Sequence, residues 1–164
     1  MSWALVIPFN RNWLALEGYA FPAFQARLEA ERVTSYLDFA GRGDDPALKA
    51  RAARDIGPVI PTLPFSLEMN VGVVPALADL LDIPSRFLLH AEQRFDYPSV
   101  LQCGDRVTVE SCLRRVSWKP KKQVCFFEKE TQFFVARRLA VNSLSVYAVR
   151  ARQNRNPAGS VSLE

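Results

Sequence analysis

The chain has 164 residues, of which 49% are hydrophobic and 23% are charged, and this balance is typical of a globular domain with a core large enough to fold unaided. Its net charge of +4 comes from basic residues interspersed with carboxylates, and no nucleic-acid-binding module is recognisable, so we expect no nucleic-acid partner. No apolar run approaches the roughly 20 residues of a membrane-spanning helix, so we expect no membrane partner either.

The first half of the chain mixes short helical patterns with proline. The aromatic stretch 3–24 contains Gly18 and Pro22, and these favour a loop or a short edge strand. A helix is predicted over 31–40, where apolar residues recur at the helical period, with Gly41 and Gly43 ending it. Asp45-Pro46 starts a second predicted helix that runs through Ala53.

Prolines at 58, 61 and 64 then predict an extended approach to a central helix. This helix includes residues 65–69 and resumes over 75–81. Its apolar composition makes it the natural cover for a sheet with one apolar face.

The second half alternates apolar and polar residues and predicts long antiparallel strands over 87–97, 106–116, 124–134 and 139–149, with a turn at 102–105. Residues 151–164 are expected to be a loose tail after one domain spanning 1–150. A long curved sheet wrapped around one central helix is the α+β arrangement known as the hotdog fold.

Four stretches resemble one protein family: 58–65 (PVIPTLPF), 88–97 (LLHAEQRFDY), 103–109 (CGDRVTV) and 143–150 (SLSVYAVR). They are similar to the "APPTFPF" segment, the "LHGEQ-x-F-x-Y" and "GD-x-V-x-V" stretches and the last strand of MaoC-like hydratases and dehydratases. The resemblance is to the N-terminal, non-catalytic type of half and extends from Glu31 to Arg150.

The resemblance implies a substrate class, namely fatty acyl, enoyl or 3-hydroxyacyl groups carried as thioesters on coenzyme A or acyl carrier protein. Members of the family add water reversibly across a 2,3-trans double bond. No cofactor is expected, because coenzyme A or acyl carrier protein serves as the carrier of the substrate. It also implies a homodimer, or a heterodimer with another hotdog subunit.

Catalytic members of the family carry an Asp and a His in a "GD-x-N-P-L-H" loop. The nearest stretch here is 41–49 (GRGDDPALK), and alignment on Pro46 places Gly43 at the Asp position and Leu48 at the His position. A shift of one residue recovers Asp44 but brings Lys49 near the His position, so neither alignment supplies the histidine. The resemblance therefore implies that a sister subunit supplies this pair.

Two residues of the chain are alternative catalytic candidates. His90, the single histidine, is either a base acting from a strand or a structural imidazole. By strand period it shares a face with Glu92, whereas Gln93 points to the other face. Glu68, on the central helix in apolar surroundings, is either a base or a carboxylate on the outer face of the helix.

Hydration also requires a donor for the thioester oxygen and a pocket for the acyl chain. Thr62 and Leu63 lie where the central helix begins and where backbone N–H groups are free, although Pro64 removes one donor. Substrate contacts are also expected from Phe65, Met69, Glu92 and Phe95, and further lining or core residues from Leu67, Leu77 and Leu81.

The basic residues of the predicted hairpin are candidates for binding coenzyme A phosphates or an acidic carrier protein, with Trp118 as a stacking surface for adenine. These residues are Arg114, Arg115, Lys119, Lys121 and Lys122. The alternative is a solvated hairpin that prevents edge-to-edge aggregation.

Sequence motifs typical of other chemistries are missing. There is no P-loop, G-x-G-x-x-G motif or metal-ligand spacing around the histidine. The three cysteines form no C-x-x-C pair, and the first ten residues lack secretory-signal features, so reduced thiols and a cytoplasmic location are expected.

Three hypotheses follow. The chain is a dehydratase subunit that depends on a sister hotdog, a self-sufficient dehydratase or thioesterase using Glu68 or His90, or a non-enzymatic acyl-thioester-binding subunit.

Overall fold

The computed structural model describes residues 6–39, 44–52, 59, 61–70 and 73–152. Within them, the elements follow in the order β1 (Ile7–Pro8), the 3-10 helix η1 (Arg11–Leu16), β2 (Ala20–Arg27), α1 (Ala30–Phe39), α2 (Pro46–Ala52), α3 (Leu63–Asn70), α4 (Val73–Leu80), η2 (Ser85–Phe87), β3 (Leu89–Asp96), β4 (Arg106–Lys119), β5 (Val124–Val135) and β6 (Arg138–Arg152). No helix in this part of the chain has both the length and the apolar character needed to cross a bilayer.

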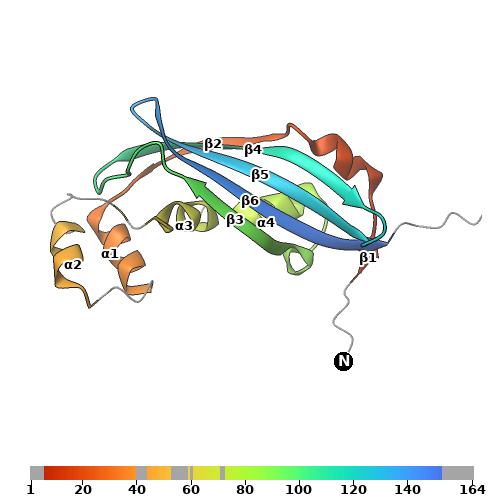
Figure 1. Cartoon of the computed structure of the whole chain (residues 1–164), viewed down its shortest axis with the longest axis horizontal. Coiled ribbons are helices and arrows are strands. Elements are labelled where there is room, and N and C mark those ends of the chain that lie inside the picture. Colours follow the sequence, from red (N-terminus) through yellow and green to blue (C-terminus); the bar gives the residue numbers. More distant parts are fainter. Residues whose placement is uncertain (1–5, 40–43, 53–58, 60, 71–72, 153–164) are drawn as a thin grey trace, which may run out of the picture.

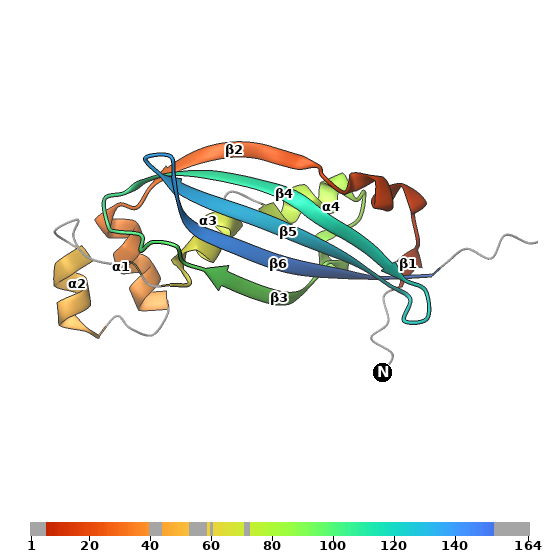
Figure 2. The ribbon, with the colours of Figure 1, turned by 45° about the horizontal axis from the view of Figure 1, so that its top comes forward.

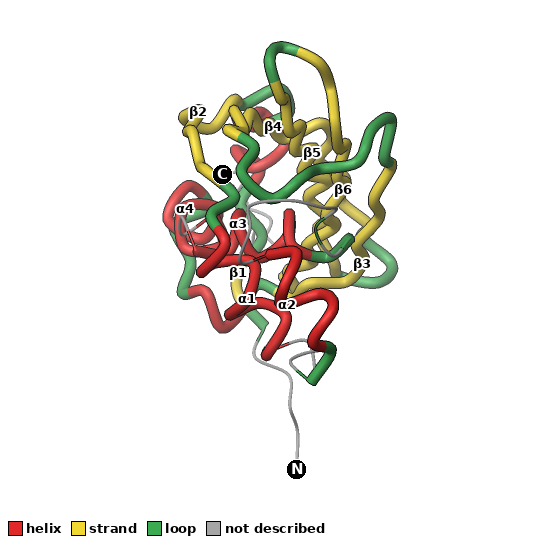
Figure 3. Tube along the Cα trace, turned by 90° about the vertical axis from the view of Figure 1, so that its left-hand side faces the viewer, coloured by secondary structure: helices red, strands yellow, loops and turns green. Residues whose placement is uncertain are grey.

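The strands form one curved sheet in the order β1-β6-β5-β4-β2, and β3 pairs with another part of β6. All pairings are antiparallel except the parallel contact of β1 with β6. The sheet curls over α3 and α4, which lie along its inner face (Figures 1 and 2). An end-on view shows β2, β4, β5, β6 and β3 as an arc around helices α1–α4 (Figure 3). This is the predicted arrangement of long strands around a central helical segment.

Alternating burial explains which face of each long strand is covered. Along β5, every second residue from Cys125 to Phe133 is buried, and the residues that alternate with them are partly exposed. The β5–β6 hairpin turns through Ala136 and Arg137, both with positive φ (47° and 65°). Two such residues match the right-handed twist of the flanking strands.

The core consists of two apolar clusters, one toward each end of the sheet. The first contains Leu63 and Leu67 of α3 with Phe133 of β5. The second contains Leu77 of α4 and Leu81 with Phe127 of β5. At about 25 cal/mol per Å² of apolar area, these two clusters supply the main driving force for covering the sheet with α3 and α4.

The predicted helices and long strands are present with shifted ends, but the N-terminal stretch is more ordered than the sequence suggested. Residues 11–16 form η1, and an eight-residue edge strand, β2, pairs with β4. Trp13 is 3% exposed, and its indole N–H donates to the Leu81 carbonyl at 3.0 Å. This contact fixes the N-terminal segment to the end of α4.

The boundaries of two predicted segments need comment. β6 continues through Ala151 and Arg152, which pair with Ile7 and Pro8, although both residues were assigned to a loose tail. The rest of that tail, 153–164, and the two glycines predicted to end α1 lie outside the described residues.

Candidate functional site

His90 lies near the start of β3, and an irregularity at Ala91 decides which residues share its face. His90 pairs with Tyr147, whereas Glu92 pairs with Val146 and Gln93 with Ser145. Because Tyr147 and Ser145 face inward on β6, His90 shares its face with Gln93 and not with Glu92. The expectation that His90 and Glu92 share a face was therefore wrong.

The exposed imidazole of His90 is held in place from three sides. Its Nε2 lies 3.1 Å from Gln93 Oε1, its ring stacks on Phe65 with centroids 5.1 Å apart, and the Tyr147 ring lies 5.3 Å away. Since an amide oxygen can only accept, Nε2 carries the hydrogen in this contact.

Gln93 is itself fixed by the neighbouring strand. Its amide nitrogen donates to Ser143 Oγ at 2.6 Å, and Ser145 Oγ donates to its amide oxygen at 2.7 Å. The chain's histidine is therefore anchored through β3 to β6, and its hydrogen-bond partner is an amide, not a carboxylate.

Glu68 points inward from α3 and meets Lys129 of β5. Lys129 Nζ lies 2.6 Å from Glu68 Oε2 and also donates to the Thr131 hydroxyl, and the two charged side chains are 0% and 2% exposed. The alternative of a carboxylate on the outer face of the helix was thus wrong. Burial lowers the pKa of the Lys129 ammonium, and the Glu68 carboxylate partly offsets that effect.

The other oxygen of Glu68, Oε1, is buried without a hydrogen-bond partner among the described residues. Tyr147, whose ring lies 5.3 Å from the His90 ring, is also near enough to Glu68 to feel its charge. Burial raises the pKa of the Tyr147 phenol to about 12, and the charge of Glu68 adds to that shift. Glu68 is thus engaged with an ammonium group, and His90 with an amide.

The predicted substrate-contact residues are spread over different environments. Phe65 is the one that stacks on His90, while Leu63 is fully buried in the first cluster. Phe95 is partly buried against that cluster, and Met69 is 44% exposed.

Two further predicted contacts have polar partners of their own. The Thr62 hydroxyl bonds the Tyr36 hydroxyl at 2.7 Å. Glu92 pairs with Arg94 at the surface.

The predicted basic residues lie at the β4–β5 hairpin and along the end of β4. Lys119, Lys121 and Lys122 are exposed at the turn, and Arg115 is exposed on β4. Arg114 lies 3.7 Å from Glu130. Trp118 stacks on Phe9 with centroids 4.1 Å apart, so one face of the indole is already covered.

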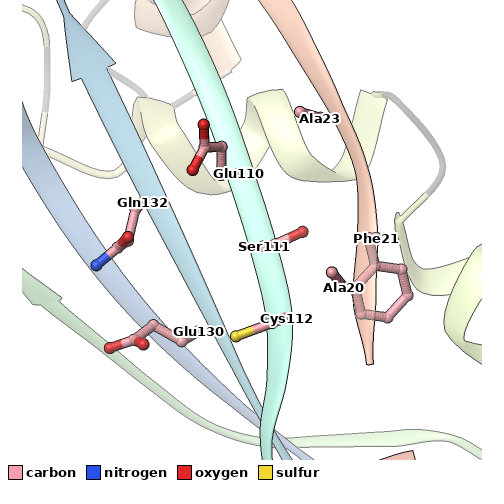
Figure 4. A pocket seen from close by; sticks show the side chains of 8 residues that line it. All are labelled: Ala20, Phe21, Ala23, Glu110, Ser111, Cys112, Glu130 and Gln132. Atoms are coloured by element: carbon pink, nitrogen blue, oxygen red, sulfur yellow. The ribbon is translucent and has the colours of Figure 1, made fainter. Parts of the chain in front are cut away.

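A cavity of about 310 Å³ opens beside β2 (Figure 4). Four of its lining residues alternate with the buried residues of β4 and β5 and so belong to the outer face of the sheet: Glu110, Cys112, Glu130 and Gln132. No predicted site residue lines it, so it is not the expected acyl pocket.

Sequence reasoning missed Lys129 and Gln93. Lys129 lies in the run FFEKETQFF, where the charges suggest a solvated strand, yet it shares parity with Phe127 and Phe133. That parity was the available signal. For Gln93, the irregularity at Ala91 shifts the period, and nothing in the local sequence marks it.

Comparison with known proteins gives the fold and the family. No curated protein sequence matches the chain. Among solved structures, it is similar to a chain of the C-terminally truncated HadBC (3R-hydroxyacyl-ACP dehydratase) complex from Mycobacterium tuberculosis, with a TM-score of 0.63 and 15% identity over 81% of this chain and 96% of that one.

Two other structures show the same hotdog fold. A chain of the ChsH1-ChsH2 complex from Mycobacterium tuberculosis has a TM-score of 0.59 and 15% identity, covering 89% of this chain and 90% of that chain. The MaoC-like dehydratase from Rhodospirillum rubrum has a TM-score of 0.56 and 16% identity, covering 83% and 93%. The family model described as "FAS1-like, dehydratase domain region" matches residues 15–139, most of the chain. The chain therefore belongs to the FAS1-like dehydratase-domain family and has the hotdog fold predicted from its sequence.

Proposed function

We propose that this chain is the acyl-binding subunit of an enoyl-thioester hydratase, or 3-hydroxyacyl-thioester dehydratase, and that a second hotdog subunit supplies the Asp–His pair. The family assignment supports the substrate class and the reaction. The proposal further assigns the acyl group to the space between the central helices and the sheet, next to Phe65 and His90.

The observation that carries the proposal is how the chain's two acid–base candidates are engaged. Glu68 Oε2 is 2.6 Å from the Lys129 ammonium, and His90 is bonded to the Gln93 amide. In an Asp–His pair, one group takes the proton of the water that attacks C3 and the other protonates C2, so both must face the same double bond. Glu68 and His90 are instead held by separate partners.

The free edge of β3 is the surface on which we place the second subunit. Among the described strands, β3 pairs with β6 alone. Leu89, on β3 itself, is 54% exposed, and Met69 is 44% exposed on α3. An open strand edge beside apolar side chains is suited to pairing with another sheet. Two of the similar structures, HadBC and ChsH1-ChsH2, are complexes.

A second candidate function, a self-sufficient hydratase using His90, is favoured by the immobilised ring. An imidazole fixed by Gln93, Phe65 and Tyr147 needs little reorganisation to act as a base. In that case the chain alone would be active as a homodimer.

Crotonyl-CoA hydration separates the two functions. The purified chain is assayed alone and with a second hotdog subunit from the same organism, by the loss of enoyl ultraviolet absorbance. We expect the chain alone to be silent and the pair to be active. Activity of the chain alone that is lost in His90→Gln would contradict the proposal and establish the second candidate. Release of free thiol in place of hydration would indicate a thioesterase.

A further inference from the structure

A row of buried polar side chains crosses the inner face of the sheet and meets α3. The strand register places Lys129 opposite Ser145, Ser145 opposite Gln93, and Thr131 opposite Ser143. Lys129, Thr131, Ser143 and Ser145 are at most 1% exposed, and Glu68 of α3 is buried as well. We call the following residues the polar belt: Glu68, Gln93, Lys129, Thr131, Ser143 and Ser145.

The polar belt lies between the two apolar clusters of the core. Along β5, Phe127 belongs to the second cluster and Phe133 to the first, with Lys129 and Thr131 between them. Along β6, Val141 and Tyr147 likewise flank Ser143 and Ser145.

The helical side is divided in the same way. Leu67 packs in the first cluster, whereas Leu77 and Leu81 pack in the second. The residues predicted to line one acyl pocket therefore belong to two separate apolar clusters, with the polar belt between them.

The ion pair of Glu68 and Lys129 lies between the two clusters. Glu68 Oε2 and Lys129 Nζ join the helix to the sheet across 2.6 Å, and Lys129 also lies 5.8 Å from the Phe21 ring centroid. An alkyl chain that extended from one cluster to the other would separate the two charges or break their hydrogen bonds. Either leaves a buried charge unpaired in an apolar surrounding, which strongly opposes the passage.

We infer that Glu68 and Lys129 are specificity-determining residues that limit the acyl chain held by this subunit to a short one. The inference rests on the proposed function, because it requires the acyl group to lie between the helices and the sheet. Whichever of the two clusters the acyl chain packs against, the polar belt prevents it from reaching the other cluster.

The test compares crotonyl-CoA with trans-2-dodecenoyl-CoA as substrates of the complex formed with the second subunit. We expect wild type to favour the short substrate in kcat/KM by about tenfold or more, the scale on which an unpaired buried charge is felt. In the double variant Glu68→Leu/Lys129→Met, which replaces the pair by apolar side chains, the long-to-short ratio should rise by about tenfold or more. The matched control Asp38→Asn/Lys49→Gln removes an exposed ion pair and should leave the ratio unchanged.

Two results would overturn the inference while leaving the proposed function intact. One is a wild-type complex that hydrates both substrates equally well, and this result does not depend on any variant folding. The other is a folded double variant with an unchanged ratio.

If no combination hydrates either substrate, the proposed reaction fails, and calorimetric binding of butanoyl-CoA and dodecanoyl-CoA to the chain decides the inference. Preference for butanoyl-CoA that is lost in the double variant supports it. Equal affinities reject it.

Discussion

At the scale of single residues, the buried pair of Glu68 and Lys129 shows how one ion pair shapes a core. Both charges are withdrawn from water, so each depends on the other for stabilisation, and Lys129 has Thr131 as a further hydrogen-bond partner. Burial of a charge on this sheet is tolerated only because the helix brings its counter-charge to the same place.

Removing one member of this pair should therefore be far more damaging than removing both. We expect Lys129→Ala or Glu68→Ala to lower the free energy of unfolding by about 3–5 kcal/mol, and Glu68→Leu/Lys129→Met to lower it by much less. Urea denaturation measures these differences. Lys49→Ala, which breaks the exposed pair with Asp38, is the control and should cost no more than about 1 kcal/mol. Equal effects for the single and double changes would contradict this account of the pair.

Two buried acids, Cys125 and Tyr147, and the partly buried Tyr97 predict how stability changes with alkaline pH. Burial raises the pKa values of Cys125, Tyr97 and Tyr147 to about 12 each. The unfolded chain loses these protons from its ordinary pKa values of 9.0 and 10.0 upward, while the folded chain keeps them. The unfolded state thus binds fewer protons in this range, and stability should fall from about pH 9 to pH 12.

The lowered pKa of Lys129 has the opposite effect on stability, because the folded chain gives up this proton at a lower pH than the unfolded chain does. The contributions of the individual acids are therefore measured by comparing variants with the wild type. Cys125→Ala and Tyr147→Phe should each make the decline above pH 9 shallower in urea titrations at a series of pH values. In the same range, native Cys125 should resist alkylation by iodoacetamide and react after unfolding. Fast alkylation of native Cys125 at pH 9 would contradict its burial.

At the scale of elements, η1 behaves as part of the core and not as a leader to it. Trp13 bonds Leu81, and its ring makes edge contacts with Phe9 and Phe127, both at 5.8 Å. These contacts join the N-terminal segment to α4 and to β5.

We expect Trp13→Ala to destabilise the chain by about 3–5 kcal/mol, because it opens a cavity in the second cluster. Trp13→Phe keeps an aromatic ring and loses the indole donor, which leaves the Leu81 carbonyl without that bond and should cost about 1–3 kcal/mol. Thermal and urea unfolding measure both. Leu14→Ala, at a 43% exposed position of the same element, is the control. Equal loss for Leu14→Ala and Trp13→Ala would contradict this role for η1.

The β4–β5 hairpin should contribute to coenzyme A affinity through charge. Lys121→Gln/Lys122→Gln should raise KM for a coenzyme A thioester several-fold in the active complex, and the effect should shrink at high salt. The matching pantetheine thioester, which lacks the distal phosphates, should show no such change. If both substrates respond alike, the hairpin's role is not phosphate binding.

The elements also show what the sequence could and could not predict. Helix α1 and the long strands follow from their apolar periods, α3 and α4 from their apolar composition after the prolines, and the turn before β4 from Gly104, whose φ is 90°. The face of His90 could not be predicted, because one extra residue at Ala91 reverses the alternation without a local signature. The pairing of Glu68 with Lys129 joins residues 61 positions apart, and only the packing of α3 on β5 brings them together.

At the scale of the whole molecule, the fold holds the His90 imidazole on the edge strand β3, whereas the Glu68 carboxylate is buried in the core and paired with Lys129. A second hotdog along β3 would bring its own catalytic residues toward Phe65 and His90. On this account, the division of labour between subunits is a consequence of how this chain packs its core.

The most direct test is hydration of crotonyl-CoA by the reconstituted complex after the second subunit's Asp and His are changed to Asn and Gln. Because the proposal places the acid–base chemistry in that subunit, we expect kcat to fall by about 10²–10⁴-fold while acyl-CoA still binds the complex. Full activity of that complex, lost only when His90→Gln is introduced into the present chain, would contradict the proposal.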